Sequence, residues 1–319
     1  MDNVLITGSS GYIGTSIAEA LFNNGYKLKL ASRKKHILCK NQKVSHIKVS
    51  KDFAAMSWSN YLNEVDTIIF CAGVAHEDEK KLNNHEIESF YDVNLKAASN
   101  LAKQAKDARI SKFIYVSTAG IHGRFSKEKI TEVSKIVIDN NYTKSKFLAE
   151  KSLNNIFKGT EVDLVILRIP MVYGFRAPGN PRKSVGLLQK GFVPVKGLNN
   201  NKRSFIFIEN LKSAILFLLK TEDKSGTFCL SDGFNYSTLQ YFEILAIIHK
   251  IPFKAIFLPK FVFYIFAFIT RKSVFKSLYS DMEISNEKFF HIFKWTPPFD
   301  SKSKVIKYSL NEGSKKEYY

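Results

Sequence analysis

The chain has 319 residues and is 45% hydrophobic and 13% aromatic, a composition too apolar for an intrinsically disordered protein. Its 48 Lys and Arg against 29 Asp and Glu give a formal net charge of +19, which favours anionic partners such as phosphates or a lipid surface. Nucleic acid is not expected, because the sequence has no zinc-finger spacing, RNA-binding aromatic signature or basic-zipper heptads.

The cysteines and histidines predict neither a disulfide framework nor a metal site. Cys39, Cys71 and Cys229 form no CxxC pair, and no histidines stand at metal-ligand spacing. The first residues lack the basic and apolar regions of a signal peptide, and the longest apolar run is far shorter than the roughly 18 residues that span a bilayer. We therefore expect a cytoplasmic protein without a resident metal.

Short apolar segments alternate with amphipathic ones through the first half of the chain. We predict strands at residues 3–7, 27–31, 45–49, 66–72, 112–117 and 163–169, and helices at residues 12–23, 85–108 and 142–157. Parallel strands need crossover connections, and the helices supply them. The pattern predicts an α/β fold with a doubly wound parallel sheet of the Rossmann type.

The sequence changes character near Gly174, where a loop rich in glycine and proline precedes shorter and less regular elements. We expect a dinucleotide-binding domain over residues 1–174 and a smaller α/β substrate-binding domain over residues 175–319, with strands free to pass between the two. A very aromatic stretch at residues 259–269 is interpreted as a core helix. The alternative, contact with a membrane surface, stays open but is not favoured.

A glycine-rich turn, TGSSGYIG at residues 7–14, follows the first predicted strand and opens the first predicted helix. Glycines at Gly8, Gly11 and Gly14 allow a tight turn and let backbone N–H groups approach a pyrophosphate at the positive end of the helix. The turn therefore predicts dinucleotide binding.

Two further segments carry hydroxyl groups suited to acid–base chemistry. Tyr142 and Lys146 stand at i and i+4, on one face of a predicted helix, where an ammonium can lower the pKa of a phenol and let it act as a base. Thr118 ends a predicted strand at the sheet edge where open parallel sheets bind ligands, so its hydroxyl can bond a reacting oxygen.

Together these motifs resemble the extended short-chain dehydrogenase/reductase family, of the NAD-dependent epimerase/dehydratase type, along the whole chain. The resemblance implies a catalytic set of Thr118, Tyr142 and Lys146. It also implies that Asn94 supports the site, that Asp52 holds the adenine, and that the segment RIPMVYG at residues 168–174 matches a family motif. The implied cofactor ligands are Gly8, Ser10, Gly11, Tyr12, Ile13, Gly14, Arg33, Asp52, Phe53, Ala72, Gly73, Asn94, Tyr142 and Lys146.

The second half of the chain is similar to UDP-sugar 4-epimerases and UDP-N-acetylhexosamine 4-keto reductases. The stretch RSFIFIEN at residues 203–210 looks like a segment whose arginine contacts the UDP pyrophosphate, so the resemblance implies substrate binding by Arg203 together with Thr118 and Tyr142. It also implies a UDP-sugar substrate and a homodimer.

Two departures from the family pattern bear on cofactor and reaction. Ser32, followed by Arg33 and Lys34, replaces the acidic residue that usually holds the ribose hydroxyls, which favours NADP(H) but leaves NAD open. Thr118 is followed by Ala119 and Gly120 in place of the Asp-Glu pair of 4,6-dehydratases, which disfavours dehydration.

The expected activity is 4-epimerisation of a UDP-hexose or UDP-N-acetylhexosamine in surface-polysaccharide biosynthesis. Three alternatives stay open: an NAD(P)H-dependent reductase of UDP-4-keto-hexosamines, a 4-epimerase of polyprenyl-diphosphate sugars, and a non-enzymatic NADP-binding sensor. A sensor would be expected to lose Tyr142 or Lys146, and this chain keeps both.

Overall fold

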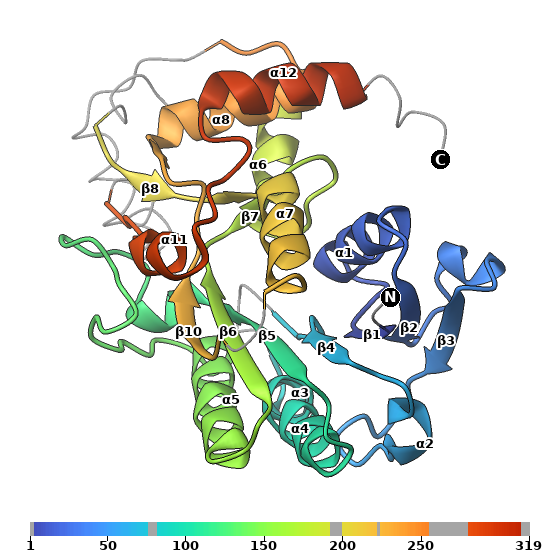
Figure 1. Cartoon of the computed structure of the whole chain (residues 1–319). Coiled ribbons are helices and arrows are strands. Elements are labelled where there is room, and N and C mark those ends of the chain that lie inside the picture. The colour runs from blue at the N-terminus through green and yellow to red at the C-terminus, as the bar shows by residue number, and fades with distance from the viewer. Residues whose placement is uncertain (1–2, 76–81, 192–199, 222–223, 255–279, 314–319) are drawn as a thin grey trace. The chain divides into compact units, whose positions relative to one another are not determined.

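The computed structural model describes residues 3–75, 82–191, 200–221, 224–254 and 280–313 (Figure 1). The aromatic stretch 259–269 lies outside these ranges, so its interpretation as a core helix stays a prediction. Within the ranges, no helix is both long enough and apolar enough to cross a bilayer.

The elements, in chain order, are β1 (Asn3–Thr7), α1 (Tyr12–Asn23), β2 (Lys27–Ser32), η1 (Ile37–Lys40), β3 (Val44–Lys48), α2 (Ser59–Leu62), β4 (Thr67–Phe70), α3 (Asn84–Phe90), η3 (Tyr91–Lys96), α4 (Ala97–Asp107), β5 (Lys112–Thr118), η4 (Ala119–His122), α5 (Asn141–Phe157), β6 (Asp163–Ile169), β7 (Val172–Tyr173), α6 (Asn180–Gln189), β8 (Arg203–Ser204), β9 (Ile206–Phe207), α7 (Ile208–Leu218), β10 (Gly226–Cys229), β11 (Asn235–Tyr236), α8 (Thr238–Ile248), α11 (Glu287–Phe293) and α12 (Lys302–Gly313).

The chain forms two compact units that alternate along the sequence. The first unit comprises residues 1–121, 136–168 and 212–228, and the second comprises residues 122–135, 169–211 and 229–319. The expected boundary at residue 174 lies close to one of these crossings, but the chain returns to the first unit at residue 212. It returns because β10 adds a strand at the edge of the large sheet.

The first unit contains a seven-stranded sheet in the order β10-β6-β5-β4-β1-β2-β3 (Figure 1). Strands β1 and β2, β2 and β3, β1 and β4, and β4 and β5 pair in parallel. The strand order reverses between β1 and β4, which is the place where open α/β sheets bind ligands outside the carboxyl ends of their strands. The predicted doubly wound Rossmann-type sheet is confirmed.

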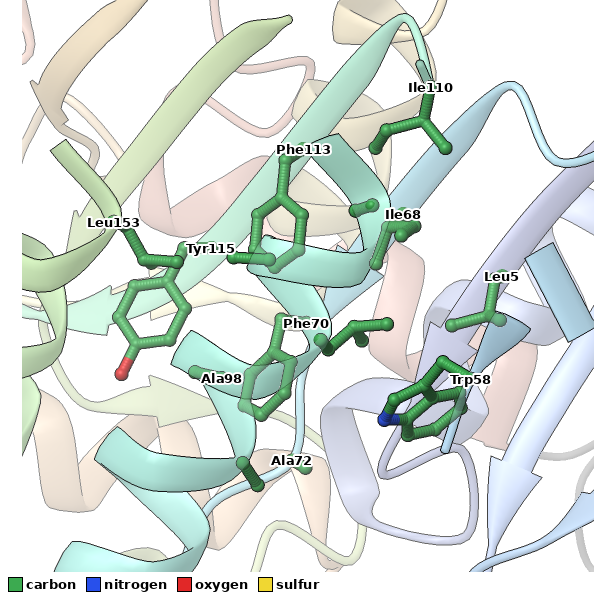
Figure 2. Close-up of a cluster of buried hydrophobic side chains, with 14 of the residues drawn as sticks. Leu5, Trp58, Ile68, Phe70, Ala72, Ala98, Ile110, Phe113, Tyr115 and Leu153 are labelled. Carbon is green, nitrogen blue, oxygen red and sulfur yellow. The ribbon is translucent and has the colours of Figure 1, made fainter. Parts of the chain in front are cut away.

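Alternation of side chains along the strands builds the core of this unit. Leu5, Ile68, Phe70, Phe113 and Tyr115 point to one face of the sheet, where α4 and α5 supply apolar side chains such as Ala98 and Leu153 (Figure 2). The intervening residues point to the other face, which α1 covers (Figure 1). Burial of this apolar surface holds the helices on the sheet and so fixes what the strand ends present.

The second unit contains two small sheets, β11-β8 and β7-β9, and the helix α8, which packs against α6 and α12. Its core includes a polar cluster around Asp232. The Asp232 carboxylate accepts hydrogen bonds from the Phe207 amide (2.8 Å), the Asn210 side chain (2.7 Å) and the Tyr173 hydroxyl (2.9 Å). The Tyr173 and Tyr236 hydroxyl oxygens are 2.9 Å apart. The buried polar groups of this cluster therefore form hydrogen bonds with one another.

Candidate active site

The glycine turn after β1 forms a cradle that side chains would fill. A Cβ atom on Gly14 would lie 2.3 Å from the Gly8 carbonyl oxygen, and one on Gly8 would lie 2.7 Å from the Ala72 Cα atom. Gly8 also has a φ of +65°, which L side chains rarely adopt. Gly11 is the N-cap of α1, and the first turn of that helix has no side-chain cap and no acidic residue. The cradle therefore fits a dinucleotide pyrophosphate at the positive end of α1.

The predicted adenosine-side residues lie at the ends of β2 and β3. Ser32 is buried, and its hydroxyl donates to the Lys34 carbonyl at 2.6 Å, whereas Arg33 is exposed. Asp52 is also exposed, and its carboxylate accepts a hydrogen bond from the Ala55 amide at 3.0 Å. The Phe53 ring is stacked on the ring of Phe70 with centroids 6.3 Å apart, so packing fixes the backbone that carries Asp52.

The end of β4 meets a distorted turn in the following helix. The predicted helix 85–108 is divided into α3, a π-helical segment over Tyr91–Lys96, and α4. The buried Asn94 lies in this segment, and its amide exchanges hydrogen bonds with the Val74 backbone at 2.9 and 3.0 Å. A Cβ atom on Gly73 would lie 3.3 Å from Asn94 Oδ1 and 3.4 Å from Lys146 Nζ. The structure thus brings Gly73, Asn94 and Lys146 together.

Thr118 and Tyr142 form a hydrogen-bonded hydroxyl pair where β5 ends and α5 begins. Both residues are partly exposed. Burial raises the pKa of the Tyr142 phenol, and the hydrogen bond with Thr118 partly opposes that rise. The Gly120 amide donates to Thr118 Oγ1 at 3.1 Å, which leaves the Thr118 proton for Tyr142. Asn140 caps α5 by accepting from the Thr143 amide at 2.8 Å, so the start of the helix that carries Tyr142 is fixed.

Lys146 is buried and points along the end of β5. Its ammonium donates to the Val116 carbonyl at 2.9 Å and lies 4.7 Å from the centre of the Tyr115 ring. Burial lowers the pKa of Lys146 to about 8, while Cys71 and Glu150 oppose that fall. Burial is the larger influence on the Tyr142 pKa, and the contact that opposes it is the Thr118 hydroxyl. The lowering of the Tyr142 pKa by Lys146 stays a prediction.

Arg203 belongs to the second unit, in β8. Its guanidinium donates to the Ser280 carbonyl at 3.0 Å, the Arg124 carbonyl at 3.3 Å and the Met282 sulfur at 3.6 Å. Burial lowers the pKa of Arg203 to about 10, and the nearby Asp281 opposes that fall. These contacts tie two segments of the second unit, one at Arg124 and one at residues 280–282, to the guanidinium of Arg203.

Sequence reasoning missed a buried ion pair next to the hydroxyl pair. Glu150, on α5, pairs with Arg168 of β6 at 2.7 Å and also accepts from Ser117. Glu150 follows Lys146 by four residues and Arg168 interrupts an apolar strand, and both features are visible in the sequence. In the described part of the chain, no three His, Cys, Asp or Glu side chains gather as a metal site would require.

The family model "NAD dependent epimerase/dehydratase family" matches residues 4–230, more than half of the chain. The UDP-glucose 4-epimerase of Vibrio cholerae is 28% identical over 307 residues, which cover 93% of this chain and 91% of that protein.

Solved structures of similar fold cover nearly the whole chain. WbmG of Bordetella bronchiseptica, solved in complex with NAD, matches with a TM-score of 0.75 at 18% identity. The matched region covers 98% of this chain and 94% of the WbmG chain. The UDP-glucuronic acid 4-epimerase of Bacillus cereus, also in complex with NAD, matches with a TM-score of 0.74 at 17% identity. The matched region covers 97% of this chain and 96% of the chain of that enzyme.

Proposed function

The chain belongs to the NAD dependent epimerase/dehydratase family, and from that premise we propose that it is a nucleotide-sugar 4-epimerase. Its substrate is a UDP-hexose or UDP-N-acetylhexosamine, inverted at C4 in surface-polysaccharide biosynthesis. The relative of Vibrio cholerae, a UDP-glucose 4-epimerase that matches most of both chains, supports this choice of reaction.

The observation that carries the proposal is the partly exposed Thr118–Tyr142 pair with Lys146 one helical turn along α5. Inversion at C4 needs a group that removes the hydroxyl proton and later returns it. Because burial raises its pKa, Tyr142 is protonated at neutral pH and serves as the acid. In the base direction the phenol must lose its proton, and we assign the stabilisation of the phenolate to the cation of Lys146, four residues along the same helix.

The residues of the cradle, Gly8 to Gly14, would hold the cofactor pyrophosphate, with Ala72 and Gly73 beside it. A bound nicotinamide supplies reversible hydride transfer at the sugar carbon. Thr118 hydrogen-bonds the sugar oxygen and Tyr142 moves its proton. Epimerisation would need no external reductant, because the hydride removed from C4 would be returned to the opposite face of the same sugar and the cofactor would end in its starting oxidation state.

NAD is the cofactor of the structural neighbours WbmG and the Bacillus cereus enzyme. The preference for NADP(H) inferred from Ser32 and Arg33 has no support from these neighbours. It stays a proposal that depends on the exposed guanidinium of Arg33, since the Ser32 hydroxyl already donates to Lys34.

Substrate binding by Arg203 and a homodimeric assembly in the cytoplasm also stay proposals. An Arg203→Met variant with a raised KM for the UDP-sugar and an unchanged kcat would support a role in holding the pyrophosphate. Light scattering of the purified chain would measure the assembly.

The deciding experiment follows UDP-glucose and UDP-N-acetylglucosamine by NMR with a catalytic amount of NAD. Accumulation of the 4-epimer without net reduction of the cofactor is expected. Consumption of NAD(P)H one-for-one with a 4-keto sugar would overturn the epimerase in favour of the reductase. Turnover confined to polyprenyl-diphosphate sugars would move the substrate to a lipid carrier, and binding without any turnover would indicate a sensor.

A further inference from the structure

Three side chains from successive elements of the first unit form a buried network around Glu150. Both oxygens of the Glu150 carboxylate are engaged. Arg168 donates from Nη2 at 2.7 Å and from Nε at 3.1 Å to Oε2, and from Nε at 3.3 Å to Oε1. Ser117 donates its hydroxyl to Oε1. Only 2% of Glu150 and 7% of Arg168 are exposed, so the ion pair is desolvated.

The network includes one residue of β5, which carries Thr118, and one residue of α5, which carries Tyr142 and Lys146. Ser117 immediately precedes Thr118 in β5, and Glu150 follows Lys146 by one turn and Tyr142 by two turns of α5. The carboxylate therefore connects the end of the strand that carries Thr118 with the helix face that carries Tyr142 and Lys146. A buried ion pair adds little net stability compared with apolar side chains of similar volume, so its value to the protein lies elsewhere.

We propose that Glu150 is a positioning residue. Its carboxylate, clamped by Arg168, holds β5 through Ser117 at the separation that lets Thr118 bond Tyr142, and it places a negative charge four residues from Lys146 on the same helix. The proposal rests on the proposed function for its kinetic readout, because positioning Thr118 against Tyr142 matters only if that pair does chemistry.

The surroundings of Lys146 support the second half of this proposal. The groups around its ammonium are the Cys71 thiol, the Tyr115 ring, the Val116 carbonyl and the Glu150 carboxylate. Burial lowers the pKa of Lys146 and raises that of Cys71 to about 12, so the thiol is neutral at working pH. Glu150 is then the anion that favours the protonated lysine.

The test separates charge from geometry with two variants and measures Lys146 directly. The protein is labelled with [13Cε]lysine, and the Lys146 resonance is assigned by its loss in Lys146→Arg. Glu150→Gln should lower the pKa of Lys146 by about one unit, since a nearby opposite charge shifts a pKa by roughly that amount or more. Ser117→Ala should leave that pKa unchanged and lower kcat about tenfold at an unchanged KM, because it loosens the geometry only.

Two control variants distinguish a positioning role of Glu150 from a purely structural one. Leu153→Ala opens a cavity in the core of the same helix and should lower the melting temperature without moving the Lys146 pKa. If Glu150→Gln does not fold, Glu150→Asp keeps the charge on a shorter stem and should preserve the Lys146 pKa while lowering kcat.

A wild-type Lys146 pKa in Glu150→Gln, a shifted pKa in Glu150→Asp, or a wild-type kcat in Ser117→Ala would overturn the proposal. The lysine titration needs no substrate. A chain that turns over no sugar would therefore defeat the proposed function, while the shift in Glu150→Gln would still decide the electrostatic role of Glu150.

Discussion

Each unit contains a hydrogen-bonded cluster with at least one tyrosine hydroxyl, and the two clusters differ in the solvent exposure of their residues. In the first unit Tyr142 bonds Thr118, and both residues are partly exposed. In the second unit Tyr173 and Tyr236 surround Asp232, and these three residues are 0%, 1% and 1% exposed. Burial raises the phenol pKa in both clusters.

A shifted pKa alone therefore does not locate chemistry in this protein. The Thr118–Tyr142 pair can meet a substrate, and Lys146 stands one turn away on the same helix. The Asp232 cluster is closed, and the three donors to its carboxylate are all neutral, so burial raises the pKa of Asp232 to about 7. Exposure, and not the direction of the pKa shift, is what distinguishes the partly exposed Thr118–Tyr142 pair from the buried Asp232 cluster.

The largest expected effect comes from Tyr142→Phe. Removing the phenol that moves the proton should lower turnover by roughly 10² to 10⁴ while the fold stays intact. The measurement is kcat for UDP-sugar epimerisation, with the melting temperature as the check of the fold. Tyr61→Phe, which removes the hydroxyl of an exposed tyrosine in α2, is the matched control and should keep wild-type turnover. Near wild-type turnover in Tyr142→Phe would show that the Tyr142 phenol is not needed for the reaction, and the proposed role of the first cluster would be wrong.

The second prediction concerns Asp232 and the pH dependence of stability. The pKa of Asp232 is about 7 in the folded chain and about 3.8 in the unfolded one. Between these values the folded state keeps a proton that the unfolded state has lost, so the free energy of unfolding falls as pH rises from about 4 to about 7. The full shift corresponds to a contribution on the order of 4 kcal/mol.

Asp232→Asn should remove this contribution while keeping the shape of the side chain. Chemical denaturation of both proteins at several pH values gives the difference in unfolding free energy, in which other titrating groups cancel. The difference should change in favour of the variant as pH rises. Parallel curves for the two proteins would show that Asp232 does not carry a raised pKa.

Tyr173→Phe has a smaller expected effect. It removes the donor to Asp232 Oδ2 and the neighbour of the Tyr236 hydroxyl, so a buried oxygen loses its partner. The free energy of unfolding should fall by about 1–3 kcal/mol. Denaturation of this variant beside Tyr142→Phe sharpens the comparison, because loss of the hydrogen bond between Tyr142 and Thr118 at a partly exposed site should lower the free energy of unfolding by less, about 0.5–1 kcal/mol.

The sheet was predictable because strand periodicity is local. The observed bounds of β1, α1 and β6 match those expected from the sequence, and the glycine turn directly follows β1. The π-helical segment at Asn94 was not predictable, since the apolar pattern of the helix continues through it. The Asn94 side chain in this segment pairs with the backbone of Val74, a tertiary contact twenty residues away that no helical pattern indicates.

The charged partners were the hardest to predict. Glu150 and Arg168 are far apart in the sequence, and only the packing of α5 against the sheet shows that they pair. The orientation of Lys146 toward Val116 likewise depends on tertiary structure, although its spacing from Tyr142 is plain in the sequence. The return of the chain to the first unit at residue 212 follows from β10 joining the large sheet, which no local pattern indicates.

The smallest expected effect comes from Arg33, whose charged side chain is exposed, unlike the residues of the two clusters. Arg33 is exposed after β2, where a 2′-phosphate of NADP(H) would be recognised, and the neighbouring Ser32 carries no charge to repel it. Arg33→Ala should weaken NADP(H) binding about tenfold, or 1.4 kcal/mol, and leave NAD(H) binding unchanged. Calorimetry measures both affinities, and Lys103→Ala, which removes an exposed charge from α4, should change neither. If wild type binds NADP(H) no more tightly than NAD(H), the cations after β2 are only part of the solvated surface, and the proposed preference for NADP(H) is wrong.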